Sequence, residues 1–112
     1  MRILVAAVND MLADYLQNAG HRTKLLYVND LALRAAQEFK ADVVLYQTTV
    51  TATVNHGDVI KELQSNGFRV VLVANPNDPL VIYALALEIK DLLLFPVDPA
   101  AILHRIENPA TI

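Results

Sequence analysis

Residues 3–10 read Ile3-Leu4-Val5-Ala6-Ala7-Val8-Asn9-Asp10, a run of apolar side chains followed directly by two polar ones. An uninterrupted, largely branched apolar run predicts a strand that is buried on both faces, as in a parallel sheet. Asn9 or Asp10 can cap a helix, because a short polar side chain accepts hydrogen bonds from the free N–H groups of the first turn. The stretch therefore predicts a strand followed at once by a helix.

The same alternation of strand and helix continues along the chain. Further strands are predicted over residues 24–28, 42–47, 69–74 and 92–95, and helices over about 10–19, 30–39, 57–65, 78–89 and 98–106. The side chains expected to face inward from the first three helices are Met11, Leu12, Tyr15, Leu16, Ala19, Leu31, Ala35, Ala36, Phe39, Val59, Ile60 and Leu63. Because each helix then connects parallel neighbours, the sequence predicts an α/β fold in three layers, doubly wound around a five-stranded parallel sheet.

The composition supports one globular domain. The chain has 112 residues, of which 54% are hydrophobic and 19% charged, with a net charge of −3 and no cysteine. This length predicts a single core, and the apolar fraction is the reverse of what disordered chains show. The absence of cysteine excludes disulfide scaffolds, thiolate metal sites and cysteine nucleophiles, and scattered basic residues argue against direct nucleic-acid binding.

The most hydrophobic stretch does not predict a membrane span. It covers residues 79–97, but Glu88, Lys90 and Asp91 lie in it and Pro96 closes it. Each ionisable group would cost about 2.5 to 3.5 kcal/mol at the centre of a bilayer, and the uninterrupted run 80–87 is far shorter than a span. The first residues do not resemble a signal peptide. We therefore expect no membrane insertion and a cytoplasmic location.

Polar residues follow the predicted strands. Ligands of open parallel sheets bind at the carboxyl ends of the strands. The residues that could form a ligand-binding ring there are Asn9, Asp10, Gln47, Thr48 and Asn75. The chain has only three glycines and no glycine-rich phosphate loop, and its three histidines lack the spacing of a shared metal site. The sequence thus predicts neither a cofactor nor a metal, and it presents no catalytic set.

Several segments resemble the CheY-like receiver domain of response regulators. They are Met1-Arg2-Ile3-Leu4-Val5, Ala41-Asp42-Val43-Val44-Leu45-Tyr46-Gln47, and Asp91-Leu92-Leu93-Leu94-Phe95-Pro96-Val97 with Asp98-Pro99-Ala100-Ala101-Ile102-Leu103. The resemblance implies a flavodoxin-like sheet with the strand order 2-1-3-4-5. We expect the receiver-like domain to cover residues 1–107, and residues 108–112 to begin a linker or tail.

The chemistry of the receiver family does not transfer to these positions. The paired acidic residues after the family's first strand match Ala7 and Val8, and the phosphoacceptor aspartate matches Gln47. The family's hydroxyl residue falls at Val73 or Ala74, and its lysine matches Phe95. The chain is therefore similar to atypical pseudo-receivers that lack the phosphorylation site, such as the N-terminal domains of TadZ- and CpaE-type proteins.

The predicted helix over residues 78–89 is apolar on every side. A helix that covers one face of a sheet needs only one apolar stripe. The apolar residues left facing outward are drawn from Leu80, Val81, Tyr83, Ala84 and Leu87. In receivers, the fourth helix, fifth strand and fifth helix commonly form a dimer or partner contact, so the resemblance implies a regulatory module that docks a protein partner or forms a homodimer, and not an enzyme.

A second hypothesis remains open. The chain could be a flavodoxin-like domain that binds a small ligand or cofactor at the carboxyl ends of its strands, through the polar ring named above.

Overall fold

The computed structural model describes residues 1–6, 10–26, 31–47, 56–74, 91–94 and 97–108, and these form five strands and four helices. The strands are β1 (Arg2–Ala6), β2 (Arg22–Leu26), β3 (Val43–Gln47), β4 (Arg69–Ala74) and β5 (Leu92–Leu94). The helices are α1 (Asp10–Asn18), α2 (Ala32–Phe39), α3 (His56–Ser65) and α5 (Pro99–Glu107). The predicted helix over residues 78–89 and the threonine-rich loop lie outside the described residues.

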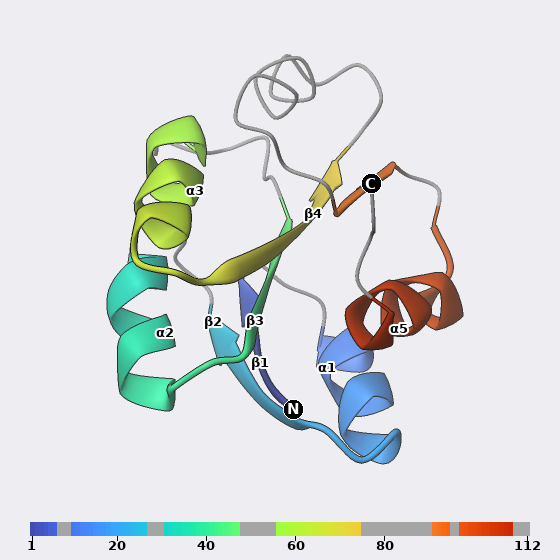
Figure 1. Ribbon diagram of the computed structural model, residues 1–112. Coiled ribbons are helices and arrows are strands. Elements are labelled where there is room, and N and C mark those ends of the chain that lie inside the picture. The colour runs from blue at the N-terminus through green and yellow to red at the C-terminus, as the bar shows by residue number, and fades with distance from the viewer. Residues whose placement is uncertain (7–9, 27–30, 48–55, 75–90, 95–96, 109–112) are drawn as a thin grey trace.

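The strands form one parallel sheet in the order β2-β1-β3-β4-β5. Helices α2 and α3 cover one face of the sheet, and α1 and α5 cover the other (Figure 1). The expected three-layer α/β fold with the strand order 2-1-3-4-5 is therefore confirmed. The second strand begins at Arg22, two residues before its predicted start, because it pairs with β1 from Arg2 onward.

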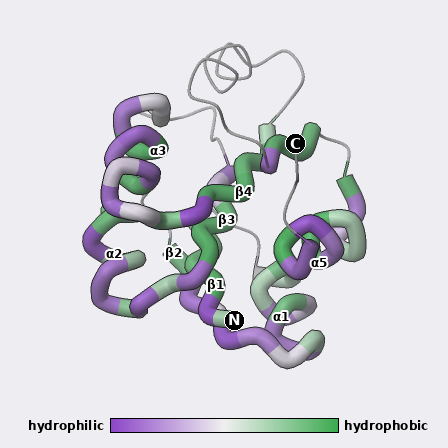
Figure 2. Tube along the Cα trace, viewed as in Figure 1, coloured by the Kyte–Doolittle hydropathy of each residue, from purple (hydrophilic) through white to green (hydrophobic). Residues whose placement is uncertain are grey.

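The core consists of two apolar clusters, one on each face of the sheet. Successive side chains of a strand point to opposite faces. Leu4, Val44 and Leu72 accordingly join the cluster under α2 and α3, whereas Val5 and Leu45 join the cluster under α1 and α5. Figure 2 shows hydrophobic residues concentrated along the central strands and a mixture of hydrophilic and hydrophobic residues along the helices around them. Burial on both faces explains why these strands are apolar at consecutive positions.

The inward stripe of α1 differs from the prediction. Leu12 and Leu16 are buried as expected, but Met11 is 80% exposed, Tyr15 is 38% exposed and Ala19 is also exposed. Met11 and Tyr15 are four residues apart, so they form a separate stripe beside the one that faces the sheet. Ala13 is buried instead, as a member of the apolar cluster under α1 and α5.

The inward stripes of α2 and α3 follow the prediction except at the ends of α2. Ala35 and Ala36 are buried, as are the three residues expected of α3. Leu31 is exposed, because it is the residue before the first helical residue, Ala32, and so lies outside the helical phase. Phe39 is half-buried, since its ring lies under the guanidinium of Arg2, whose Cζ is 5.6 Å from the ring centre.

The predicted end of the helix at residue 65 and the predicted start of the last helix near residue 98 are both confirmed. Gly67 follows α3 with a φ of 84°, a left-handed conformation that glycine adopts without steric cost, and the N–H of Phe68 donates to the carbonyl of Leu63 at 3.1 Å. Pro99 is the first residue of α5, where a proline loses no helical hydrogen bond. These local signals could be identified in the sequence because they depend on neighbouring residues only.

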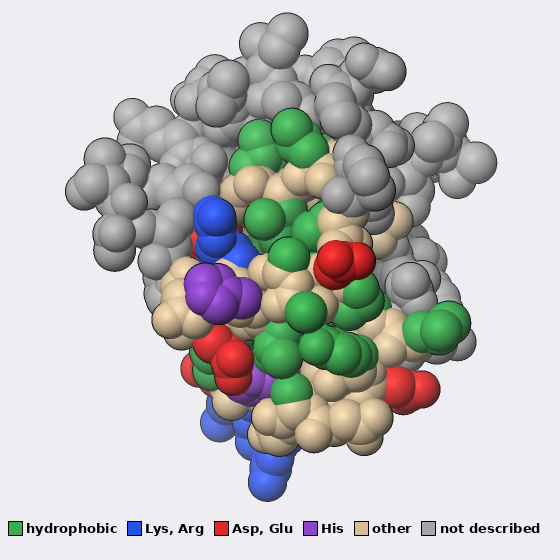
Figure 3. Space-filling view, turned by 90° about the vertical axis from the view of Figure 1, so that its right-hand side faces the viewer, with side chains coloured by type: hydrophobic (Ala, Val, Ile, Leu, Met, Phe, Trp, Pro, Cys, Tyr) green, Lys and Arg blue, Asp and Glu red, His purple; other side chains and the backbone are tan. Residues whose placement is uncertain are grey.

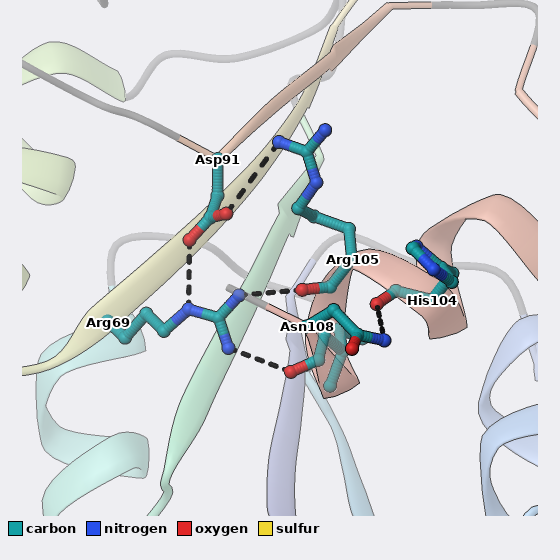
Figure 4. A network of polar contacts seen from close by, with 6 residues as sticks. Arg69, Asp91, His104, Arg105 and Asn108 are labelled. Carbon is teal, nitrogen blue, oxygen red and sulfur yellow. Dashed lines mark hydrogen bonds and ion pairs between the residues drawn. The ribbon is translucent and has the colours of Figure 1, made fainter. Parts of the chain in front are cut away.

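A half-buried arginine ties α5 to the amino edge of the sheet (Figure 4). Arg69, the first residue of β4, donates from Nε to a carboxylate oxygen of Asp91 at 2.8 Å. Its two terminal nitrogens donate to the carbonyls of Arg105 and Ile106, each at 2.8 Å. These carbonyls lie in the last turn of α5 and have no partner further along the helix, so the cation compensates for missing backbone bonds and for the negative end of the helix dipole.

Asp91 joins this contact to β5. Its side chain is 8% exposed, and its second carboxylate oxygen lies 3.8 Å from the Nη1 atom of Arg105. Its carbonyl accepts a hydrogen bond from the N–H of Leu72, which continues the pairing of β4 with β5. Asp91, read in the sequence as an obstacle to membrane insertion, therefore links two strands to a helix. No described helix is both long enough and apolar enough to cross a membrane.

We predict that Arg69→Met destabilises the protein by about 3 kcal/mol, the lower end of the range for breaking a buried ion pair, because Arg69 is about a quarter exposed. The variant leaves the carboxylate of Asp91 in a largely buried position without its closest cation. Urea denaturation followed by circular dichroism measures the change.

Arg34→Met is the matched control. Arg34 pairs with Glu38 at 3.1 Å, but both side chains are mostly exposed, so the loss is expected to be below about 0.5 kcal/mol. Equal losses in the two variants would show that the contacts of Arg69 do not hold α5 to the sheet.

Candidate functional site at the carboxyl edge of the sheet

The carboxyl ends of the strands meet at one edge of the sheet, which is the upper edge in Figure 1. In the described part of the chain, β1 ends at Ala6, β3 at Gln47 and β4 at Ala74. The register places Ala6 opposite Tyr46, Gln47 opposite Val73, and Ala74 opposite Leu94. An open parallel sheet binds ligands at this edge, so it is the first place to seek a site.

The structure brings together three of the predicted site residues. Gln47 is half-buried, while Val73 and Ala74 are buried beside it. Asp10 is the first residue of α1. The other predicted site residues lie outside the described residues: Ala7, Val8, Asn9, Thr48, Asn75, Leu80, Val81, Tyr83, Ala84, Leu87 and Phe95.

The described strand ends do not fit a magnesium ion. Receiver chemistry implies such an ion, and Mg²⁺ in proteins usually takes one or two carboxylates. The last residues of β1, β3 and β4 are Ala6, Gln47 and Ala74, of which only Gln47 has a side-chain oxygen. Within the described ranges, no group of three or more His, Asp or Glu residues could hold a metal.

Gln47 also lacks the chemistry of a phosphoacceptor. A carboxylate can attack a phosphoryl donor through its anionic oxygen, but an amide oxygen carries no full negative charge. Val73, its partner on β4, has no hydroxyl to bond a phosphoryl group. Of the last residues of β1, β3 and β4, only Gln47 can form a side-chain hydrogen bond.

Beside this amide, the structure contains a cavity of about 250 Å³ that the sequence analysis missed. It lies on the α1 and α5 face, between the strand ends and the two helices. Its lining residues are Val5, Ala6, Met11, Leu12, Tyr15, Leu45, Gln47, Val73, Val97, Pro99 and Ile102.

One signal of the cavity was present in the sequence. Val5, Leu45 and Val73 lie one or two residues before the ends of the neighbouring strands β1, β3 and β4, they belong to the same apolar cluster, and none of them is polar. By the receiver resemblance, Gln47 stands in place of the phosphoacceptor aspartate and Val73 or Ala74 in place of a hydroxyl residue, so the loss of these polar groups could have indicated an apolar hollow. Its enclosure by Met11, Tyr15 and Ile102 could not be predicted, because it depends on how α1 and α5 pack.

Comparison with known proteins supports the fold. No family model matches the chain, and no curated protein matches it significantly. Among solved structures, the chain is similar to the BeF3-activated N-terminal receiver domain of RstA from Klebsiella pneumoniae, with 18% identity, a TM-score of 0.81 and 96% of each chain covered.

Two other receiver domains are equally similar. The receiver domain of the TMAO respiratory system response regulator TorR has 16% identity and a TM-score of 0.83, with 96% of this chain and 93% of that one covered. A response regulator receiver domain from Clostridium thermocellum has 19% identity and a TM-score of 0.81, with coverages of 96% and 91%. The chain thus has the CheY-like fold of response regulator receiver domains.

Proposed function

We propose that the chain is a phosphorylation-independent pseudo-receiver, a regulatory module that acts by binding a protein partner or a second copy of itself and not by catalysis. The observation that carries the proposal is Gln47, which ends β3 next to Val73 where the receiver resemblance expects the phosphoacceptor. An amide in this place leaves the fold intact but removes the group that would accept a phosphoryl group.

The apolar setting of Gln47 supports the loss of the whole site and not of a single residue. Ala6 and Ala74 end the neighbouring strands, and neither can bind a cation through its side chain. The sequence adds Ala7 and Val8, which match the family's metal-binding acidic pair. A phosphoryl transfer to this edge would lack both its acceptor and its charge-stabilising metal.

We predict that the protein remains unmodified when it is incubated with acetyl phosphate and Mg²⁺, as measured by intact mass spectrometry. Gln47→Asp alone should also remain unmodified, because it restores the acceptor carboxylate without the metal ligands. A phosphoryl adduct on the unaltered protein would contradict the proposal. An adduct on Gln47→Asp only would show that the edge still binds the metal.

The surface proposed for docking comprises β5, α5 and the predicted helix over residues 78–89; we call it the β5–α5 face. In the described part, Leu94 is 42% exposed at the end of β5, the outermost strand next to β4. Leu92 and Leu93 are half-buried on the same strand. Burying a large aliphatic side chain contributes about 1.5 to 3 kcal/mol in transfer terms, so a few such residues support association.

Self-association through this face would make a symmetric dimer, the commonest form of soluble oligomer. We predict that Leu94→Glu and Leu87→Glu each raise the dimer dissociation constant at least tenfold, because each buries a charge twice in a symmetric contact. Light scattering combined with size-exclusion chromatography over a range of concentrations measures the association.

Met11→Glu is the matched control, since Met11 is 80% exposed and lies on α1, which is not part of the β5–α5 face. It should leave the dissociation constant unchanged. If the protein stays monomeric at high concentration and binds no partner through this face, the docking role is refuted. If Met11→Glu has an equal effect, the contact lies on another surface.

The proposal includes a domain that extends over residues 1–107 and a cytoplasmic location. Helix α5 ends at Glu107, and Asn108 bonds back to the carbonyl of His104 through its backbone N–H at 2.8 Å and through its side chain at 3.0 Å. The backbone bond is the last i→i−4 bond of the helix, and Asn108, which donates it, has the non-helical angles φ −126° and ψ 88°, so the helix ends where the receiver-like pattern ends in the sequence.

A further inference from the structure

We propose that the cavity between α1 and α5 binds a small, neutral and largely apolar molecule whose single polar group forms a hydrogen bond with Gln47. This inference goes beyond the proposed docking role, because it concerns a cavity between α1 and α5 and a different class of ligand. Gln47 joined the ligand-binding ring expected from the sequence, but the structure places it beside aliphatic side chains.

The volume of the cavity limits the size of the ligand. At about 250 Å³ it is larger than the roughly 150 Å³ apolar cavity that accommodates benzene. It is slightly smaller than pockets for drug-sized molecules, which begin at about 300 Å³. A molecule of two fused rings, or an aliphatic one of similar bulk, matches this volume.

The lining determines the polarity of the ligand. None of the described residues that line the cavity is charged. Val5, Leu45 and Val73 contribute from the sheet, and Leu12 and Ile102 close the sides from α1 and α5. A charged ligand would lose its hydration here without gaining an opposite charge, whereas an apolar one gains contact area.

Gln47 is the amide of this lining. An amide has two N–H donors and a carbonyl acceptor, so it can pair with a hydroxyl, a carbonyl or a ring nitrogen of a bound molecule. One such bond at the end of an apolar cavity fixes the orientation of the ligand, as polar groups do in most small-molecule sites.

The rim of the cavity exposes apolar area without a described cover. Met11 and Tyr15 both line the cavity, and they are 80% and 38% exposed. Figure 3 looks onto the face that carries α1 and α5 and shows hydrophobic side chains gathered along its middle. A methionine at the rim can adjust to different ligand shapes, because its side chain is unbranched and flexible.

The test uses 2-naphthol, a neutral two-ring probe with one hydroxyl group, and 2-naphthoate, its negatively charged counterpart. We expect 2-naphthol to bind with a dissociation constant below about 1 mM, measured by calorimetry. In amide NMR spectra it should shift the ends of β1 and β3 and residues of α1 and α5. The carboxylate of 2-naphthoate should weaken binding at least tenfold, since a charge buried without a partner costs more than about 1.4 kcal/mol.

Two variants and one control locate the binding. Val97→Phe places a ring where the half-buried Val97 lines the cavity, and it should weaken binding at least tenfold. Gln47→Leu should weaken it about fivefold through the lost hydrogen bond. Leu31→Phe adds the same ring at an exposed position before α2, on the opposite face, and should have no effect.

The proposal is overturned if 2-naphthol gives no saturable shifts up to its solubility limit, or if the shifts fall on α2 and α3. It is also overturned if Val97→Phe binds as tightly as the unaltered protein. If Val97→Phe does not fold, the affinity of Gln47→Leu for 2-naphthol tests the proposal in its place. This substitution alters only a half-buried side chain at a strand end. Light scattering of the same samples measures self-association separately. A failure of the docking role can therefore be distinguished from a failure of ligand binding.

Discussion

Both faces of a parallel sheet must be removed from water, and the rest of this structure depends on that constraint. The connection between parallel strands needs a crossover, and the crossover helices cover the faces. Here they divide into α2 and α3 on one face and α1 and α5 on the other. The constraint also accounts for much of the apolar excess, because consecutive residues of β1, β3 and β4 are all buried.

With the faces covered, polar chemistry in the described structure concentrates at the edges of the sheet. At the amino edge, Arg69 joins Asp91 to the last carbonyls of α5, and Asp42 accepts a hydrogen bond from the N–H of Arg2 at 2.8 Å. The Nε2 atom of His21, the residue directly before β2, lies 3.2 Å from the Oε2 atom of Glu107 in α5. These contacts connect segments that are distant in sequence, so the amino edge holds the layers together. The candidate site lies at the opposite, carboxyl edge.

The carboxyl edge shows how a fold can persist while its chemistry changes. At 16% identity the chain keeps the receiver architecture with a TM-score of 0.83, because the architecture depends on apolar periodicity, helix starts and turns. Ala6, Gln47 and Ala74 end three strands of this sheet, so the architecture does not require charged residues at these positions. An apolar cavity is possible at this edge because none of the described residues that line it is ionised and must be hydrated.

The sequence by itself determined the number of strands, the layers and the residues at the strand ends. Apolar runs, caps such as Asp98-Pro99 and stops such as Gly67 act over a few neighbouring residues, so they can be read locally. Only the tertiary structure decided that Met11 and Tyr15 stand at the rim of a cavity, that Arg69 meets Asp91, and that Leu31 is exposed. These outcomes depend on the rotation of each helix and on contacts between segments far apart in the chain. No local pattern encodes them, because several rotations satisfy the same periodicity and packing selects one.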